Sequence, residues 1–342
     1  MEGRGHASAV VARKRKILAI DGGGIKGAFP AAFLAAIEEA TGKRIAEHFD
    51  LVAGTSTGGI IALGLGLGLS TKEILNFYQQ HGRRVFGQDT DDTRFLGRLA
   101  SFWRKQRRRV RELAGPAYDP LVLRNALEGA FGRKRLGDSE VRLIIPAYSI
   151  NTRSVYVFKT AHHRRFEVDC KRSAVDVALA TAAAPTYFPA HALGDAALLV
   201  DGGVWANNPT GMAAVEAVGV LGWRADDLRI LSLGCTESLY TCPPRGGRLD
   251  FALSLNTFFQ QGQSVSSLGT AKLLCGHREN APRLFRYALD VAQERIKLDS
   301  AEAIGELVAM GSTVARTALP AVRDVFLDEP VERFVPISSF SP

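Results

Sequence analysis

The sequence KILAIDGGGIKG spans residues 16–27, and HFDLVAGTSTGG spans residues 48–59. Each is an apolar run typical of a buried strand, followed by a turn of small residues and then a helical pattern. Strands alternating with helices predict an α/β fold with a mostly parallel central sheet covered on both faces. The apolar runs along the chain predict strands at Lys16–Ile20, Leu51–Ala53, Arg142–Tyr148, Val155–Phe158, Ala197–Val200 and Arg229–Leu233. Helices are expected at Ala28–Ala40, after a Ser70–Glu73 capping box, and at Ala174–Ala184.

The second stretch contains Gly54-Thr55-Ser56-Thr57-Gly58, which has the G-x-S-x-G spacing of a nucleophile elbow. A nucleophilic serine needs an exposed hydroxyl on a tight strand-to-helix turn, where larger neighbouring side chains would clash. Ser56 is therefore the candidate nucleophile.

The first stretch contains Gly22-Gly23-Gly24-Ile25-Lys26-Gly27 immediately before a predicted helix. An acyl-transfer reaction develops a negative oxygen, and backbone N–H groups on a glycine loop at a helix start can stabilise it. The two loops together predict a serine acyl hydrolase.

The same first loop also satisfies G-x-G-x-x-G, the fingerprint of dinucleotide-binding folds. That alternative expects an acidic residue at the end of the second strand, about 20 positions on. Here Asp50 precedes the second strand, and the serine turn follows it. The alternative predicts NAD binding. A P-loop is excluded, because no G-x-x-x-x-G-K-[ST] sequence occurs.

An attacking serine needs a base. In a Ser–Asp–His order with Asp201 as the acid, only His277 follows, and its context LLCGHREN resembles a polar surface loop. Asp201 offers a second solution, because it ends an apolar run and precedes Gly202-Gly203. A carboxylate on such a turn can reach the serine without a histidine between them. The residues alone leave both solutions open.

The chain has 342 residues, a net charge of +8 and 46% hydrophobic residues, which is ordinary for a globular protein. The positive charge favours acidic partners such as anionic lipid or nucleotide phosphate. Four cysteines without a C-x-x-C pair favour free thiols in a reducing cytosol. The sequence has no cluster of residues with the spacing of metal ligands, so no metal site is expected. The uncharged run from Leu51 to Thr71 contains six glycines, which favours a strand, a turn and a buried helix over a membrane span.

We expect a disordered leader at residues 1–14 and a single domain at 15–342, with its core at about 15–240. A polar, basic insertion occupies about 83–119 and includes SFWRKQRRRVREL. The part after about Pro243 has a mainly helical pattern and shows no clear strand until the end.

Three motifs in order resemble the patatin-like phospholipase family: DGGGIKG (21–27), GTSTG (54–58) and DGG (201–203). AAAPTYF (182–188) and NNP (207–209) are also similar to patatin sequences. The resemblance implies a three-layer α/β/α fold and a Ser–Asp dyad without a catalytic histidine. Ser56 is then the nucleophile and Asp201 the proton acceptor. The resemblance assigns the oxyanion hole to Gly22, Gly23 and Gly24. The residues expected to support the elbow and the motif loops are Lys26, Gly27, Gly54, Gly58, Gly202 and Gly203.

The segments LGLGLGLS (63–70), LGDS (136–139) and VYVFKTAHH (155–163) resemble one bacterial subgroup. These are the phospholipase effectors of cyclic-oligonucleotide-based antiphage signalling (CBASS). The resemblance implies a cytoplasmic enzyme that needs no catalytic cofactor and hydrolyses phospholipids at the inner membrane surface. Its expected activator is a cyclic dinucleotide, such as a cGAMP, from a partner nucleotidyltransferase; a homo-oligomer is compatible, and no DNA or RNA partner is expected.

Cationic donors for the two phosphates and flat groups for the two bases would form such a nucleotide site. The candidates are Arg83, Arg84, Lys159, His162 and His163, together with the Phe102–Arg111 stretch. The last of these is also a candidate for binding anionic lipid headgroups. Each of these groups is equally compatible with a solvated charged surface. The alternatives are a constitutive lipid acyl hydrolase of the same fold and a nucleotide sensor with an inactive elbow.

Overall fold

The computed structural model describes residues 13–86, 118–194, 197–235, 237–238, 248–291 and 303–337. An eight-stranded sheet forms the centre of the molecule, in the order β5-β6-β3-β2-β1-β7-β9, with β4 also paired to β3. Its strands are β1 (Arg15–Ile20), β2 (Leu51–Gly54), β3 (Arg142–Ser149), β4 (Ser154–Lys159), β5 (His191–Leu193), β6 (Ala197–Asp201), β7 (Leu228–Leu233) and β9 (Leu284–Tyr287). The pairs β1–β2, β1–β7, β2–β3 and β7–β9 are parallel, whereas β3–β4, β3–β6 and β5–β6 are antiparallel.

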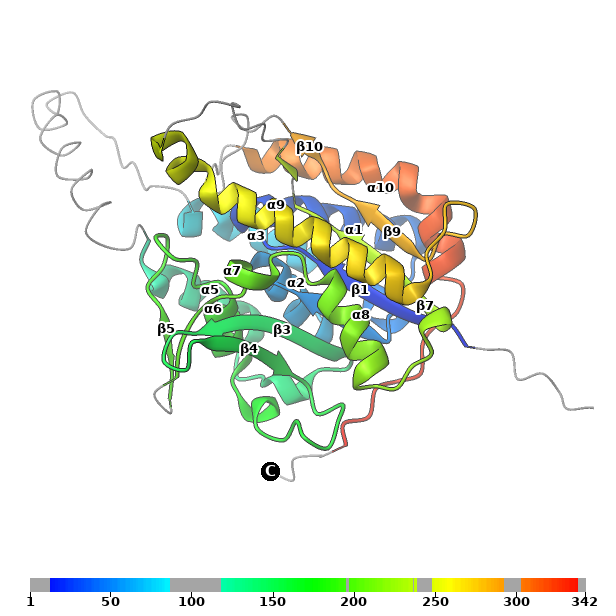
Figure 1. Ribbon diagram of the computed structural model, residues 1–342, viewed down its shortest axis with the longest axis horizontal. Helices are drawn as coiled ribbons and strands as arrows, with labels where there is room; N and C mark the ends of the chain where they lie inside the picture. The colour runs from blue at the N-terminus through cyan, green and yellow to red at the C-terminus, as the bar shows by residue number, and fades with distance from the viewer. Residues whose placement is uncertain are drawn as a thin grey trace, which may run out of the picture.

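Helices cover both faces of this sheet, because successive strand residues point to opposite sides. Leu18 and Ile20 of β1 belong to one apolar cluster with the helices α1, α2, α3, α5, α6 and α10. Ile17 and Ala19 belong to the other cluster, with α8 and α9. In Figure 1, α9 passes in front of the sheet and α1 lies behind it. The predicted three-layer α/β/α architecture is confirmed.

The helices follow the apolar periodicity of the sequence. Their bounds are α1 (Ala28–Thr41), α2 (Thr57–Gly66), α3 (Thr71–Phe86), α5 (Pro120–Phe131), α6 (Ala174–Thr181), α7 (Gly203–Ala206), α8 (Thr210–Gly219), α9 (Arg248–Cys275) and α10 (Ile304–Phe326). The expected capping box is present before α3: the Glu73 carboxylate accepts the Ser70 N–H at 2.8 Å, and the Ser70 hydroxyl accepts the Glu73 N–H at 3.2 Å. Every residue of α2 is buried, which explains the uncharged run. None of the described helices is long and apolar enough to cross a membrane.

The expectation of no clear strand after Pro243 is wrong. Strand β9 (Leu284–Tyr287) pairs with β7 in the central sheet, and β10 (Asp290–Val291) pairs with β8 (Glu237–Ser238) in a small separate sheet. The sequence signal is weak because β9 has only four residues and one of them is arginine. Strand β5 was also missed, and it has only three residues.

Three sequence predictions fall partly or wholly outside the described residues. They concern the leader up to residue 12, most of the basic insertion with its Phe102–Arg111 stretch, and Cys242. The other cysteines, Cys170, Cys235 and Cys275, are free thiols.

The two ends of the sheet carry different groups. Strands β1, β2 and β7 are parallel, so their carboxyl ends lie at one edge, which we call the catalytic edge. Asp21, Ser56 and Cys235 follow these strands there. At the opposite edge, the C-terminal segment 327–337 is bound across the starts of the strands. Its Asp328 pairs with Lys16, and its Val331 N–H donates to Glu47 O.

Candidate active site

Ser56 stands on the turn between β2 and α2 in a strained backbone conformation. Its φ of 54° and ψ of −122° lie in a region that residues other than glycine rarely adopt. The turn is tight enough to exclude side chains at its flanking glycines. A Cβ on Gly54 would lie 2.1 Å from Gly58 O, and one on Gly58 would lie 2.3 Å from Ile20 O. This is the geometry that the G-x-S-x-G spacing predicts for a nucleophile elbow.

Two threonines hold this turn in place. The Ser56 N–H donates to Thr181 Oγ1 at 3.0 Å, and the Thr181 hydroxyl donates to Pro146 O at 2.6 Å. The Thr55 hydroxyl donates to Ala206 O at 2.6 Å, which ties the elbow to the segment after Asp201. Sequence reasoning missed Thr181, because a threonine at the end of an alanine-rich helix gives no signal.

Asp201 reaches Ser56 because β6 runs antiparallel to β3. Asp201 ends β6 opposite Ala147, and the turn after it places its carboxylate beside the elbow. The Ser56 hydroxyl lies beside this carboxylate, and the Asp201 Oδ1 accepts the Gly203 N–H at 2.6 Å. Burial raises the pKa of Asp201 to about 6, although the neighbouring Ser56 hydroxyl and the Gly203 N–H lower it. A carboxylate with such a pKa is suited to accept a proton near neutral pH.

The glycine loop lies against Ser56 and the segment after Asp201. The Gly22 N–H donates to Asn207 O at 2.9 Å, so this N–H is occupied. A Cβ on Gly22 would lie 3.3 Å from Ser56 Cβ and 2.5 Å from Asn207 Oδ1. Among the described residues, neither the Gly23 N–H nor the Gly24 N–H has a recorded hydrogen-bond partner. These two N–H groups therefore remain as donors for an oxyanion.

The remaining motif glycines are also in close contact with their neighbours. A Cβ would come within 2.5 Å of Cys235 at Gly23, 2.2 Å of Thr57 at Gly27 and 2.3 Å of Pro146 at Gly202. Gly203 has slightly more room, since its Cβ would lie 3.0 Å from Asp201 Oδ1. Lys26 is partly buried, and burial lowers its pKa.

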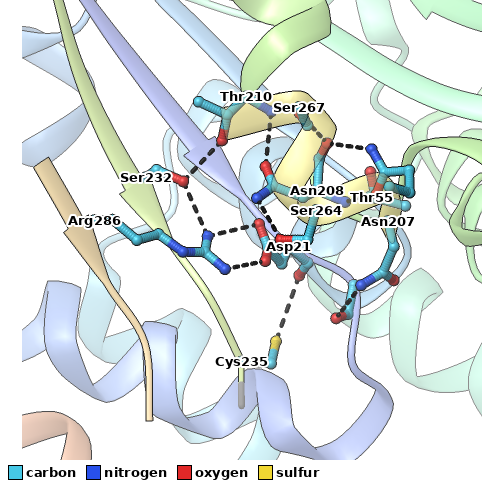
Figure 2. Close-up of polar contacts among 12 residues, drawn as sticks. Asp21, Thr55, Asn207, Asn208, Thr210, Ser232, Cys235, Ser264, Ser267 and Arg286 are labelled. Atoms are coloured by element: carbon cyan, nitrogen blue, oxygen red, sulfur yellow. Dashed lines mark hydrogen bonds and ion pairs between the residues drawn. The ribbon is translucent and has the colours of Figure 1, made fainter. Parts of the chain in front are cut away.

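A network of polar contacts connects the glycine loop to α8, α9 and β9 (Figure 2). Asn208 lies at its centre: its N–H donates to Gln263 Oε1 at 2.9 Å, and its Nδ2 donates to Ser264 Oγ at 3.0 Å. On the other side of the loop, Asp21 forms an ion pair with Arg286. Arg286 lies in a strand that the sequence did not reveal, so this contact was missed.

His277 lies at the wrong end of the sheet to serve Ser56. Its Nδ1 accepts the backbone N–H groups of Arg283 and Leu284, at the start of β9. Leu284 pairs with Ile230, which in turn pairs with Ile17 near the start of β1. Ser56 follows the carboxyl end of β2, so His277 is out of reach of Ser56, whereas the Asp201 carboxylate lies beside it.

The five candidate nucleotide-binding residues do not form one cluster. Lys159 and His162 both bind buried Glu216, with Nζ–Oε2 at 2.7 Å and Nε2–Oε1 at 3.1 Å. Burial lowers the pKa of His162. His163 is in ring contact with Phe166. Arg83 and Arg84 are exposed in the last turn of α3, which lies apart from β4 in Figure 1.

Two cavities lie beside α3. One of about 330 Å³ lies between α2, α3 and α5 and is lined mainly by apolar groups such as Ile60, Phe77 and Phe131. A smaller one of about 140 Å³ is lined by His81 and Arg84. Among the described residues, no group of three or more His, Cys, Asp or Glu side chains is arranged to hold a metal ion.

Comparison with known proteins finds one family model and several relatives of known name. A sequence model described as patatin-like phospholipase matches residues 18–214, more than half of the chain. A cGAMP-activated phospholipase of Pseudomonas aeruginosa is 37% identical over 219 residues, which are 64% of this chain and 61% of that protein. One of Vibrio cholerae is 32% identical over 243 residues, covering 67% of this chain and 66% of that protein. Patatin-like protein 2 of Oryza sativa is 33% identical over 234 residues, 61% of this chain and 54% of that protein. The matches thus cover less than two thirds of the length of these relatives.

Proposed function

Since the chain belongs to the patatin-like phospholipase family, we propose that it hydrolyses the fatty-acyl esters of membrane phospholipids with a Ser56–Asp201 dyad. The observation that carries this proposal is a buried carboxylate beside the Ser56 hydroxyl, with a pKa raised to about 6. Near pH 7 that carboxylate is mostly ionised, yet it is basic enough to accept a proton during attack.

In the proposed mechanism, Ser56 Oγ attacks the ester carbonyl while its proton passes to Asp201. The carbonyl oxygen becomes negative, and the N–H groups of Gly23 and Gly24 stabilise it. Collapse of this tetrahedral intermediate expels the lysolipid alkoxide, which takes the proton from Asp201. Water then attacks the acyl-Ser56 ester, with Asp201 again accepting the proton. Collapse of the second intermediate releases the fatty acid, and Asp201 returns the proton to Ser56 Oγ.

Fatty-acid release from vesicles of bacterial phospholipids tests this mechanism. We expect Ser56→Ala to abolish release, whereas His277→Ala keeps near-normal turnover because His277 lies at the other end of the sheet. Both variants should retain the wild-type circular dichroism spectrum. Equal release by the wild-type chain and Ser56→Ala would overturn the proposal.

We further propose that a cyclic dinucleotide such as a cGAMP activates the enzyme. The support is that two relatives, 37% and 32% identical, carry the name cGAMP-activated phospholipase. In this proposal a partner nucleotidyltransferase supplies the nucleotide on phage infection. The phospholipase then degrades lipid at the inner surface of the cell's own membrane, as an abortive-infection effector.

The nucleotide site is proposed at the end of α3. Arg83 and Arg84 are exposed there, and Arg84 and His81 line the smaller cavity. The other candidates are less suitable, because Lys159 and His162 are already bound to Glu216. A guanidinium pair can hold phosphates by charge-assisted hydrogen bonds.

A panel of cyclic dinucleotides, added to the vesicle assay, tests this regulation. The double variant Arg83→Ala/Arg84→Ala should lose most of the nucleotide-dependent release and keep the basal release. Arg133→Ala, which removes another exposed arginine, is the matched control and should respond like the wild type. Full release without any nucleotide would identify a constitutive lipid acyl hydrolase instead.

A further inference from the structure

Asp21 and Arg286 form a two-pronged ion pair beside the glycine loop (Figure 2). Arg286 Nη1 donates to Asp21 Oδ1 at 3.0 Å, and Nη2 donates to Asp21 Oδ2 at 2.6 Å. The Arg286 side chain is only 15% exposed, and the Asp21 side chain only 7%. A bidentate pair of this kind fixes direction as well as distance, since two parallel hydrogen bonds define the plane of the carboxylate.

Asp21 is the residue directly before the oxyanion donors. Its own N–H donates to Leu233 O at 2.9 Å, so its backbone is fixed to β7. One residue later, the Gly22 N–H is fixed to Asn207 O. The loop is therefore held on both sides, and the directions of the Gly23 and Gly24 N–H groups depend on these two attachments.

Neighbouring residues of β7 and α8 hold Arg286 in this position. Arg286 stands opposite Ser232 in the β7–β9 ladder, and its Nη1 also donates to the Ser232 hydroxyl at 2.9 Å. Ser232 and Thr210 share a hydrogen bond of 2.7 Å at the start of α8. Gly234 leaves room for the guanidinium, because a Cβ there would lie 2.6 Å from Arg286 Nη2.

A charge argument adds to the positional one. An ionised Asp21 next to the loop would oppose the negative oxygen that forms on the substrate, because like charges repel strongly where water is excluded. The Arg286 guanidinium compensates this carboxylate at contact distance. The loop can then present its N–H groups to the oxyanion without a net negative charge behind them.

We propose that Arg286 is a positioning residue for the oxyanion loop, defined as Gly22–Gly24, and that it acts through Asp21. The inference deepens the proposed function and rests on it. Arg286 lies beyond residues 18–214, the part of the chain that matches the family, and enters the site from β9. The C-terminal part of the chain thereby contributes to the catalytic edge.

Steady-state hydrolysis of a soluble ester, p-nitrophenyl butyrate, by full-length variants tests this role. Arg286→Met should lower kcat about 100-fold with little change in KM, since a displaced oxyanion donor affects the transition state more than the bound ester. The acid limb of the pH profile should stay where it is, because Asp201 is untouched. Arg286→Lys should recover only part of the activity, because lysine keeps the charge but cannot form both parallel hydrogen bonds. Guanidinium at millimolar concentration should raise kcat of Arg286→Ala.

Arg283→Met is the matched control. Arg283 precedes the same strand and forms an ion pair with Asp226, whose side chain is 71% exposed, so its loss should leave kcat unchanged. A folded Arg286→Met with wild-type kcat would overturn the proposal. If that variant does not fold, Arg286→Lys decides: wild-type kcat together with wild-type exchange at the loop overturns the proposal, and a lowered kcat at unchanged KM supports it.

Amide hydrogen exchange at Gly23 and Gly24 separates this inference from the proposed function. Faster exchange there in Arg286→Met than in Arg283→Met would support the positioning role even if the wild-type chain showed no Ser56-dependent turnover. Unchanged exchange would count against it. Absence of Ser56-dependent turnover would by itself overturn only the proposed function.

Discussion

Asp201 at the catalytic edge and Asp328 at the opposite edge of the sheet are carboxylates in contrasting environments. Burial alone would raise the pKa of both. Asp328 receives hydrogen bonds from Lys16 and Lys14, and its pKa falls to about 2. Asp201 lies beside only the Ser56 hydroxyl and the Gly203 N–H, and its pKa rises to about 6. Two differences separate the outcomes: Asp201 is buried more deeply than Asp328, and only Asp328 has lysine partners.

This contrast extends to the surroundings of the two residues. The opposite edge contains further stabilising pairs, such as Arg15 with Asp50 at 3.1 Å and Arg142 over the Phe334 ring at 5.0 Å. The catalytic edge has the Asp21–Arg286 pair, but it also holds the strained backbone of Ser56 and the Asp201 carboxylate, which has no cationic partner among the described residues. Strain of this kind persists only where the surrounding structure enforces it. We infer that the pairs at the opposite edge help to offset the strain and the buried charge at the catalytic edge.

Removing the base should have the largest effect. We expect Asp201→Asn to lower kcat for ester hydrolysis by about 10³-fold or more, because an amide cannot accept the serine proton. Burst-phase release of p-nitrophenol would show whether acylation of Ser56 is the step that is lost. Asp176→Asn, a change in another half-buried carboxylate, is the control and should remain active. An active Asp201→Asn enzyme would show that Asp201 is not the base, and the contrast with Asp328 would then say nothing about catalysis.

Closing the space at the elbow should have the next largest effect. Gly58→Ala places a Cβ 2.3 Å from Ile20 O and 2.7 Å from Asp21 O, so the elbow and the glycine loop must move apart. We expect a loss of about 3 kcal/mol in unfolding free energy, together with loss of activity. Urea unfolding would measure the first and ester hydrolysis the second.

Gly129→Ala is the matched control for this change. Gly129 also lies in a helix, but its Cβ would meet nothing within 4 Å. Alanine should therefore stabilise that helix by up to about 1 kcal/mol, as its helix propensity predicts. If both substitutions stabilise the protein, the tight packing of the catalytic edge is not the reason for glycine at position 58.

The sequence was sufficient where a side-chain type and a local turn define the feature. Ser56 and Gly58 were predictable because a nucleophile elbow needs both within one turn. Asp201 was a candidate base from its residues, and the family resemblance favoured it over His277. The residues alone did not separate the two, since that depends on which end of the sheet each occupies. That position follows from strand order, which long-range pairing determines.

Other features had no signal in the sequence. Arg286 lies in a four-residue strand that exists only because β7 offers an edge to pair with. The occupied Gly22 N–H depends on Asn207, which is 185 positions away. The binding of Lys159 and His162 to Glu216 likewise joins distant segments. A pattern within one segment does not report such contacts.

The raised pKa of Asp201 has a consequence for stability. A carboxyl whose pKa is raised on folding stabilises the protein below its unfolded pKa, near 3.8, and that contribution is lost as the pH rises through about 6. At pH 8 the wild type therefore carries an unfavourable buried charge. For a pKa shift of about two units, this charge lowers the free energy of unfolding by about 3 kcal/mol. Asp201→Asn should be more stable than the wild type, with a difference about 1–2 kcal/mol larger at pH 8 than at pH 5. Urea unfolding of both proteins at the two pH values measures this difference in stability. A difference that does not grow with pH would contradict the raised pKa of Asp201.

The smallest effect is expected at the opposite edge. Asp328 has a lowered pKa, so its contribution to the free energy of unfolding is present above about pH 4. That contribution is lost as the pH falls through about 2. Its side chain is 29% exposed, and solvent screening reduces the value of the pair with Lys16. We expect Asp328→Asn to lower the unfolding free energy by about 1–2 kcal/mol at pH 7 and to leave kcat unchanged. Asp324→Asn, which loses only a pair between side chains 59% and 63% exposed, should change neither. Equal stability of the two variants at pH 7 would mean that the C-terminal segment is held by its backbone and apolar contacts, and that the paired carboxylate does not stabilise this edge.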